Sequence, residues 1–373
     1  MIENYFPNSA DFDEMNIQFE KIALAIGKRI DVSTWAKVRN AVKSGIAPIV
    51  FPVGTELSVN HSVYGKKTYL VVAHNYFKSS KNNNDHTMTI MSDEAFAPAQ
   101  YDESEAFYYA ESRLAAGTYN FTLATAFSSW AAGTYQFTLT NALPSGGQLC
   151  ISGSPSAVMT SAKVKAYSSR LATDASETVA ISVGSGGVNL GTFGVELNHI
   201  SRVAYGSNNY KESAIRQFLN SSADAGSVWS PQTKFDRPPS WQTTLAGFAG
   251  GLDTDFLSIV GEVLVPCATN NIYESTDSTT PKGKKYTVSD KFYLASQKEI
   301  FGDVTNVLDD SSILFPYYDG ATNADRVKSA TSWWTRSALA TSSCDGIVVN
   351  NEGILTTTTA NTTQSCAVVC TII

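Results

Sequence analysis

The apolar positions of the first 46 residues follow a helical spacing. Between residues 17 and 26 they recur at intervals of three and four, which places them on one face of a helix. A second such face covers 35–42, after the possible capping residues Asp31, Ser33 and Thr34 and before Gly45. The pattern predicts two short amphipathic helices over 1–46. They form either an attachment and oligomerisation segment or a part of the domain that follows, and the sequence favours neither alternative.

The pattern changes to short apolar runs after residue 46. β-Branched and apolar residues cluster at 49–51, 57–59, 68–72 and 88–91, and short polar or glycine-containing segments separate these clusters. Such punctuation is typical of strands joined by turns. We therefore expect 47–100 to be strand-rich.

A nine-residue repeat lies in the next hundred residues. The sequence AAGTYNFTL at 115–123 returns as AAGTYQFTL at 131–139, with one difference. Tyr, Phe and Leu alternate with Thr and an amide residue, so the large apolar side chains share one face of a strand. Two copies are too few for a solenoid. The repeat predicts paired antiparallel strands in a β-sandwich-like module over 101–200.

Short helices and strands alternate in the rest of the chain. A capping box at Asn209 predicts a helix to about Asn220, and a second helix is expected over 252–260. A strand at 292–294 precedes a capped helical turn that ends at Gly302. The final strands are expected at 333–336, 347–349, 354–356 and 366–373.

Composition and charge limit the kinds of partner. The 373 residues are 43% hydrophobic and 16% charged, with a net charge of −7 that is spread along the chain. A nucleic-acid partner requires concentrated lysine and arginine, so none is expected. The basic stretch Lys282, Lys284 and Lys285 fits a solvated loop tip. No run approaches the roughly 20 apolar residues of a membrane span, and the N-terminus does not fit a signal peptide.

The sequence offers little catalytic chemistry. Its four histidines have no metal-ligand spacing, and the pairs Asp253–Asp255 and Asp309–Asp310 fit helix ends or turns better than a calcium or acid–base site. Cys366 and Cys370 would share one face of a strand at about 13 Å, too far apart for a disulfide. We interpret them as buried structural residues. The sequence thus indicates binding rather than catalysis, with no metal or cofactor.

Several segments of the second half carry a resemblance to a known family. They resemble, in order and spacing, a phage-associated C-type-lectin-like domain family, whose best-studied members are tropism determinants and other variable proteins of diversity-generating retroelements. The matching segments are 205–220, 229–241, 247–257, 291–302, 315–318 and 333–337.

The resemblance implies an α+β fold in which two helices flank a small twisted antiparallel sheet. The main part of the lectin-like domain would be 201–373 and its first part 47–100, with the β-module inserted between them. Trp333 and Trp334 would belong to the core, one on each side of their strand. Arg336 would hydrogen-bond backbone carbonyls to hold a loop. Family members are commonly homotrimers.

The resemblance also places a ligand-binding face after the paired tryptophans. Family members carry many Tyr and Asn residues there, whereas this chain has mostly Thr, Ser and Ala. The face would consist of Leu339, Thr341, Ser342, Ser343, Ile347, Asn350, Thr356, Thr357, Thr358, Thr359, Asn361 and Thr363.

These observations predict a bacteriophage virion surface protein, from a tail or surface fibre and made in the host cytoplasm. Its lectin-like face would contact a host cell-surface protein or glycan, and its N-terminal segment other virion proteins. The alternative is a structural capsid or tail decoration protein without receptor binding. An enzyme acting on surface glycan is a weaker interpretation, because no carboxylate pair stands out. A bacterial chain of prophage origin also stays open.

Overall fold

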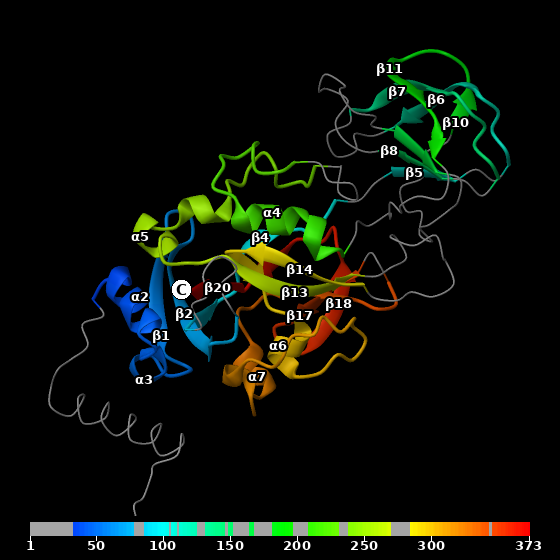
Figure 1. The fold of residues 1–373 in the computed structure, drawn as a ribbon. Coiled ribbons are helices and arrows are strands. Elements are labelled where there is room, and N and C mark those ends of the chain that lie inside the picture. Colours follow the sequence, from blue (N-terminus) through cyan, green and yellow to red (C-terminus); the bar gives the residue numbers. More distant parts are fainter. Residues whose placement is uncertain are drawn as a thin grey trace, which may run out of the picture.

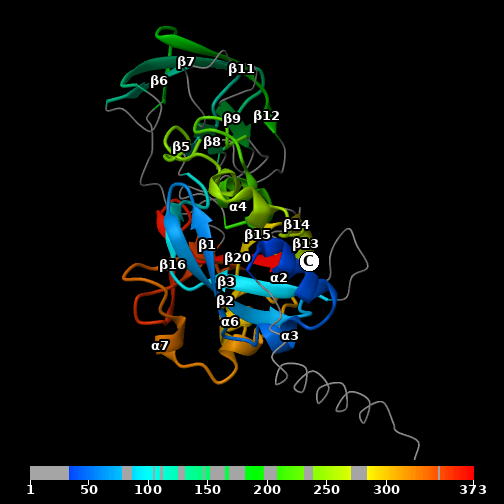
Figure 2. The ribbon, with the colours of Figure 1, turned by 90° about the vertical axis from the view of Figure 1, so that its left-hand side faces the viewer.

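The chain folds into a mixed α+β body and a separate β-module (Figures 1 and 2). The predicted α+β class is therefore confirmed at this level. The predicted helix at 17–26 lies outside the described residues. The computed structural model describes 33–77, 86–103, 106–109, 112–124, 131–145, 148–151, 164–167, 181–196, 208–230, 238–269, 284–342 and 345–373.

The first sheet of the body joins the beginning of the domain to its end. Its five strands pair antiparallel throughout, and both central strands, β3 and β20, are buried along their whole length. In order across the sheet, they are β1 (Glu56–His61), β2 (Gly65–His74), β3 (Met88–Ser92), β20 (Val368–Ile372) and β15 (Phe292–Leu294). The predicted strands at 57–59, 68–72, 88–91 and 292–294 are confirmed.

The second sheet carries the paired tryptophans. Its neighbours pair antiparallel except β16 and β19, which run parallel. In order, the strands are β18 (Leu355–Thr359), β17 (Asp345–Val349), β16 (Trp333–Ala338), β19 (Gln364–Cys366) and β4 (Phe96–Ala99). Both sheets thus combine strands from 56–99 with strands from 292–372, so two distant segments of the chain build one body.

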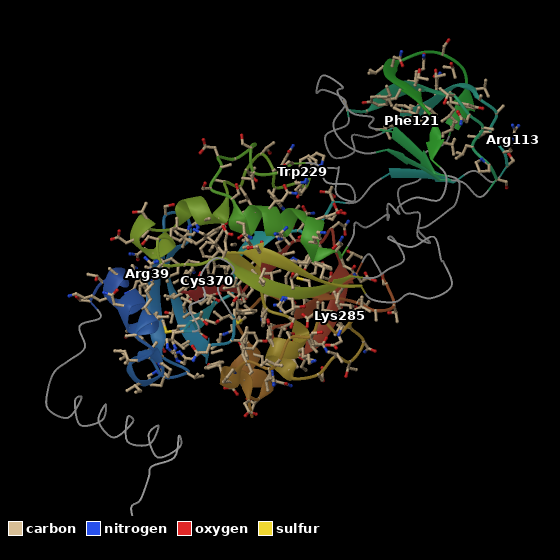
Figure 3. All side chains as sticks on the ribbon, in the orientation of Figure 1. Arg39, Arg113, Phe121, Trp229, Lys285 and Cys370 are labelled. Carbon is tan, nitrogen blue, oxygen red and sulfur yellow. The ribbon has the colours of Figure 1, made fainter. Side chains whose placement is uncertain are left out.

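One expectation about the C-terminal strand was wrong. The chain leaves the second sheet after Cys366 and enters the first at Val368, so Cys366 and Cys370 lie in different sheets rather than on one strand face. Both thiols are free and buried, as predicted, and Figure 3 shows Cys370 inside the body. Burial raises the pKa of each thiol, which keeps it protonated and unreactive.

Two strands and several short helices cover the sheets. The expected strand at 49–51 instead belongs to a helical turn, because Pro48 fits the first turn of a helix. The expected helix 209–220 is interrupted at Ser213, whose hydroxyl caps a new helix by accepting a hydrogen bond from the Arg216 N–H. These elements are β13 (Val263–Thr269), β14 (Lys284–Asp290), α2 (Trp35–Lys43), α3 (Ala47–Val50), η1 (Tyr210–Glu212), α4 (Ala214–Asn220), η2 (Phe248–Gly251), α5 (Thr254–Leu257), α6 (Gln297–Phe301), η4 (Pro316–Tyr318) and α7 (Asn323–Arg326).

The helix α2 packs on the body. Thr34, one of the three expected capping residues, caps it, and its apolar face, including Val38 and Val42, is buried in the main core. The Arg39 Nε of the same helix donates to the main-chain oxygen of Ile373 at 3.0 Å. The described part of the N-terminal segment is therefore part of its own domain. The attachment role stays a prediction for the residues before it.

The described residues of the β-module form two four-stranded sheets. The repeats form the antiparallel neighbours β6 and β7, and their alternation is as predicted: Tyr119, Phe121 and Phe137 are buried. On the polar face the Thr118 and Thr138 hydroxyls form a hydrogen bond at 3.0 Å. The strands are β10 (Ile181–Val183), β6 (Gly117–Leu123), β7 (Gly133–Leu139) and β11 (Val188–Phe193) in one sheet, and β12 (Val195–Glu196), β9 (Val164–Tyr167), β8 (Gln148–Ile151) and β5 (Ala106–Tyr109) in the other.

Candidate functional site

The paired tryptophans lie at the centre of the body. Trp333 and Trp334 are both fully buried, on opposite faces of β16. The Trp333 Nε1 donates to the carbonyl of Arg326 at 3.3 Å, and the Trp334 Nε1 donates to that of Ala99 at 2.9 Å. Each indole therefore has its polar group satisfied in the core. The prediction that both belong to the core is confirmed.

Trp334 packs directly on the neighbouring strand at a glycine. A Cβ atom on Gly346 would lie 2.6 Å from the Trp334 Cζ3, closer than real atoms approach. The Tyr101 ring meets the indole edge-on at a centroid distance of 4.9 Å. Glycine on β17 is thus required for the indole to lie flat against the sheet.

Arg336 forms a buried ion pair two residues after the tryptophans. Its Nη1 and Nη2 donate to the two carboxylate oxygens of Glu299, at 2.6 and 2.7 Å, and neither side chain is exposed. Its Nε and Nη1 also donate to the carbonyls of Pro266 and Leu294, at 2.9 and 2.8 Å. The expected carbonyl contacts are therefore present, but the charge partner Glu299 was not anticipated. The guanidinium joins β13, β15, β16 and α6.

The electrostatics of this pair favour two ions held in a dry site. Burial by itself would lower the pKa of Arg336, but the neighbouring Glu299 charge reverses this and leaves it well above the usual value. Burial raises the pKa of Glu299, and Arg336 opposes that rise. The same carboxylate accepts the Ser296 N–H in the capping box of α6 and the Tyr76 hydroxyl at 3.3 Å. Its oxygens are fully used in structural contacts.

The pair Asp309–Asp310 makes contacts with basic side chains of the body. Asp309 binds Lys285 at 2.8 Å and Lys298 at 3.0 Å, and the bonds to Lys285, Ser311 and Lys298 lower its pKa. Lys285 thus lies in β14 and pairs with a carboxylate, where the sequence predicted a free loop tip. Asp310 is buried, with its Oδ2 at 3.5 Å from the Arg336 Nη2.

The predicted binding face centres on the edge strand β18. Thr356 and Thr357 are exposed, and Thr358 and Thr359 are partly exposed. The Thr359 hydroxyl lies 2.9 Å from that of Thr362, and the Thr358 hydroxyl donates to the same group at 3.2 Å. The hydroxyls at the end of β18 are thus ordered by one another, while those of its first half face solvent.

Loops extend this face at both ends of β18. At one end, the Asn350 side chain accepts the N–H groups of Glu352 and Ile354, each at 2.9 Å, which fixes the turn from β17. At the other end lie the partly exposed Asn361 and the exposed Thr363.

The loop between β16 and β17 also reaches the face. Thr341 is exposed, and Ser342 is partly exposed. Ser343 lies outside the described residues. Asn208, which sequence reasoning missed, donates from its Nδ2 to the carbonyls of Ser342 at 2.9 Å and Asp345 at 2.8 Å. This buried amide fixes both ends of the loop.

Two predicted members of the face are not available at its surface. Leu339 is 8% exposed and Ile347 is 3% exposed, and both pack with Val307 in a small cluster under the sheet. Their apolar side chains gain more from this packing than from exposure to water. They are support for the face rather than contact residues, so the prediction was wrong for them.

Two pockets lie away from this face. One of about 360 Å³ is mainly apolar and includes Tyr76, Leu264 and Ile313. The other, of about 610 Å³, lies beside α4 and includes the Arg216–Asp290 ion pair, whose closest atoms are 2.7 Å apart. Burial raises the pKa of Asp290, and Arg216 opposes the rise. The charges of Arg216 and Asp290 in this pocket thus neutralise each other.

Two further features concern metal ligands and membrane spans. Among them, no three His, Cys, Asp or Glu side chains gather in a way that could hold a metal ion. The described helices include none that is both long and apolar enough to cross a membrane.

Comparison with known proteins gives one finding. Neither the curated proteins nor the solved structures contain a match to this chain. The sequence pattern of one family, described as a domain of unknown function (DUF6273), matches residues 185–372, just over half of the chain. That range holds the tryptophan strand, the buried ion pair and the threonine-rich edge described above. The chain belongs to this family, the domain of unknown function DUF6273.

Proposed function

We propose that this chain is a bacteriophage virion surface protein, and that its threonine-rich edge binds a host cell-surface protein or glycan. The body would be a C-type-lectin-like domain used for display. The observation that carries the proposal is the contrast between the two parts of one sheet. Trp334 and Arg336 are fully buried and tied to several strands, whereas Thr356 and Thr357 two strands away are exposed.

Such a contrast suits recognition, because the residues that stabilise the fold are not the residues that would contact a partner. Exposed side chains on an edge strand contribute little to folding, so they can change without loss of the core. The framework beneath them holds the backbone in place, which lowers the entropy lost on binding. Short threonine side chains make small contacts, so we expect weak single sites that gain strength by multivalent display.

The pairing of early strands with late strands supports the assignment of 47–100 and 201–373 to one domain. The strand β3 pairs with β20, and β4 pairs with β19, so the segment 47–100 and the end of the chain build the same two sheets. This arrangement fits an early part and a main part of one lectin-like domain, with the β-module inserted between them.

A labelling experiment on phage particles tests the surface location. Particles carrying Thr356→Cys would be treated with a maleimide dye, with Val369→Cys, a fully buried position, as the matched negative control. Both chains would also carry Cys150→Ser and Cys344→Ser, which leaves only buried native thiols. The proposal expects the chain among the virion proteins by mass spectrometry and dye on the Thr356→Cys chain only. Absence from particles would contradict the virion role. Presence without labelling would mean that another subunit covers the face, as in a decoration protein.

A further inference from the structure

The outer edge of β18 is regular, and no other strand of the described residues pairs with it. Its five residues pair with β17 in unbroken register, from Leu355 opposite Val349 to Thr359 opposite Asp345. Among the described residues, β18 is the last strand on this side of the sheet. The other outer strand, β4, contains Pro98 and a left-handed residue, Ala97, with φ of 53°. Proline and irregular backbone discourage edge pairing, and β18 has neither.

The hydrogen-bond pattern shows which backbone groups face outward. The Asn350 N–H donates to the Ile354 carbonyl at 2.9 Å, so the inward-facing residues continue with Thr356 and Thr358. The Ile347 carbonyl, opposite Thr357, instead accepts the Thr335 hydroxyl from β16 at 3.0 Å. Both observations place the N–H and C=O of Leu355, Thr357 and Thr359 on the side away from β17.

Hydrogen bonds fix the turns at both ends of the strand. The Asn350 side chain anchors the turn before it, and the Thr362 N–H donates to the Thr359 carbonyl after it. The strand carries no charge and consists of Leu followed by four β-branched residues, which favour extended pairing. An incoming strand would therefore meet a preformed template.

We propose that β18 pairs antiparallel with β18 of a second copy of this chain, about a two-fold axis at Thr357. In this register Thr357 lies opposite its own counterpart, and Leu355 lies opposite Thr359 of the other copy. Every outward-facing residue then meets an outward-facing residue. The N–H and C=O of Thr357 can pair across the two-fold axis, and so can the Thr359 N–H with the Leu355 C=O, while the Thr359 carbonyl already accepts the Thr362 N–H. No like charges are brought together, because the strand has none.

This pairing goes beyond the proposed function and does not depend on it. It uses backbone groups at the edge and leaves the Thr356 and Thr357 hydroxyls on the two faces of the sheet. Two copies would present one continuous threonine surface. The contact is small for a protein interface, so we expect association that depends on protein concentration.

Site-directed disulfide trapping tests the register. In a two-fold pair, the Cα atoms of residue 357 would be about 5.5 Å apart, within disulfide range. Those of residue 356 would be roughly 8 Å apart, outside it. The full chain would carry Cys150→Ser and Cys344→Ser, because Cys267, Cys366 and Cys370 are already buried. Thr357→Cys and Thr356→Cys would then be oxidised mildly, and the disulfide-linked dimer would be measured on non-reducing gels.

We expect at least a tenfold higher dimer yield for Thr357→Cys than for Thr356→Cys, and a monomer–dimer equilibrium of the native chain in sedimentation. Equal yields at the two positions would overturn the two-fold register. A monomer at all concentrations would overturn self-pairing while leaving host binding open. A three-copy mass would instead fit the homotrimer that the family resemblance implies, and would also overturn this proposal.

Discussion

Arg336 and Glu299 form a two-pronged ion pair, with N–O distances of 2.6 and 2.7 Å, in which neither side chain touches solvent. The pair ties the strand of the paired tryptophans to the capping box of α6. Both ions are buried, so Glu299 depends on Arg336 for compensation of its charge, and Arg336 depends mainly on Glu299, with Asp310 at 3.5 Å. The pair therefore helps to fix the sheet whose edge strand, β18, carries the exposed threonines.

Removal of one partner of this pair should be costly. Glu299→Gln removes the closer of the two carboxylates at Arg336 and leaves only Asp310, whose Oδ2 lies 3.5 Å from the Nη2, so we expect a loss of about 3–5 kcal/mol in the free energy of unfolding. Chemical denaturation of the variant and the native chain measures this difference. The control Glu352→Gln, at an exposed turn, should change it by less than about 0.5 kcal/mol. Similar small effects at both positions would show that the pair does not anchor the sheet.

Gly346 should not tolerate a side chain. The Cβ of Gly346→Ala would meet the Trp334 indole at 2.6 Å, so the indole or the strand must shift. We expect a loss of about 1–3 kcal/mol and a changed near-ultraviolet tryptophan signal. Gly194→Ala is the matched control, because its nearest neighbour, the Thr140 hydroxyl, lies at 3.5 Å. An unchanged signal for Gly346→Ala would contradict the packing described.

The ion pairs of Asp309 with Lys285 and Lys298 should make the stability of the fold depend on pH. These contacts lower the pKa of Asp309 below its unfolded value of about 3.9. A carboxylate of this kind stabilises the fold above the unfolded pKa, and the contribution disappears as the pH falls through the folded pKa. Its side chain is 42% exposed, so solvent screens the charges and we expect at most about 1 kcal/mol.

Thermal unfolding of the native chain and Asp309→Asn from pH 7 to pH 2 checks this. The native chain should be slightly more stable at pH 5–7, and the difference should shrink below about pH 4. Asp319→Asn, at an exposed position, serves as the control. A difference that grows as the pH falls would have the wrong sign for this contact.

Structure that depends on neighbouring residues could largely be predicted from the sequence. The repeat gave the strands β6 and β7 because alternation of aromatic and small polar residues has the period of a strand. The capping box of Ser296 and Glu299, with Gly302 left-handed at φ of 77°, was also predictable from neighbouring residues. The burial of Trp333 and Trp334 followed from the family resemblance and from their place in an apolar strand.

Contacts between distant segments could not be read in this way. The sequence assigns Glu299 to a helix cap, because its capping contacts are with neighbouring residues. Its ion pair with Arg336, 37 positions away, has no such local pattern. The passage of the chain from β19 to β20 at Ala367 separates two cysteines that strand periodicity would have put on one face. Leu339 and Ile347 were assigned to a surface by the resemblance, but their apolar side chains pack inward. In each case tertiary packing decided the outcome.

The binding of a Thr356→Ala/Thr357→Ala double variant to intact host bacteria, measured beside its unfolding free energy, tests the central claim most directly. The matched control is Thr122→Ala/Thr134→Ala, which removes a threonine pair from the polar face of the β-module. We predict that the β18 variant keeps its stability to within about 1 kcal/mol and loses at least tenfold in cell binding, while the control keeps both. Unchanged cell binding by the stable β18 variant would contradict a recognition role for this edge.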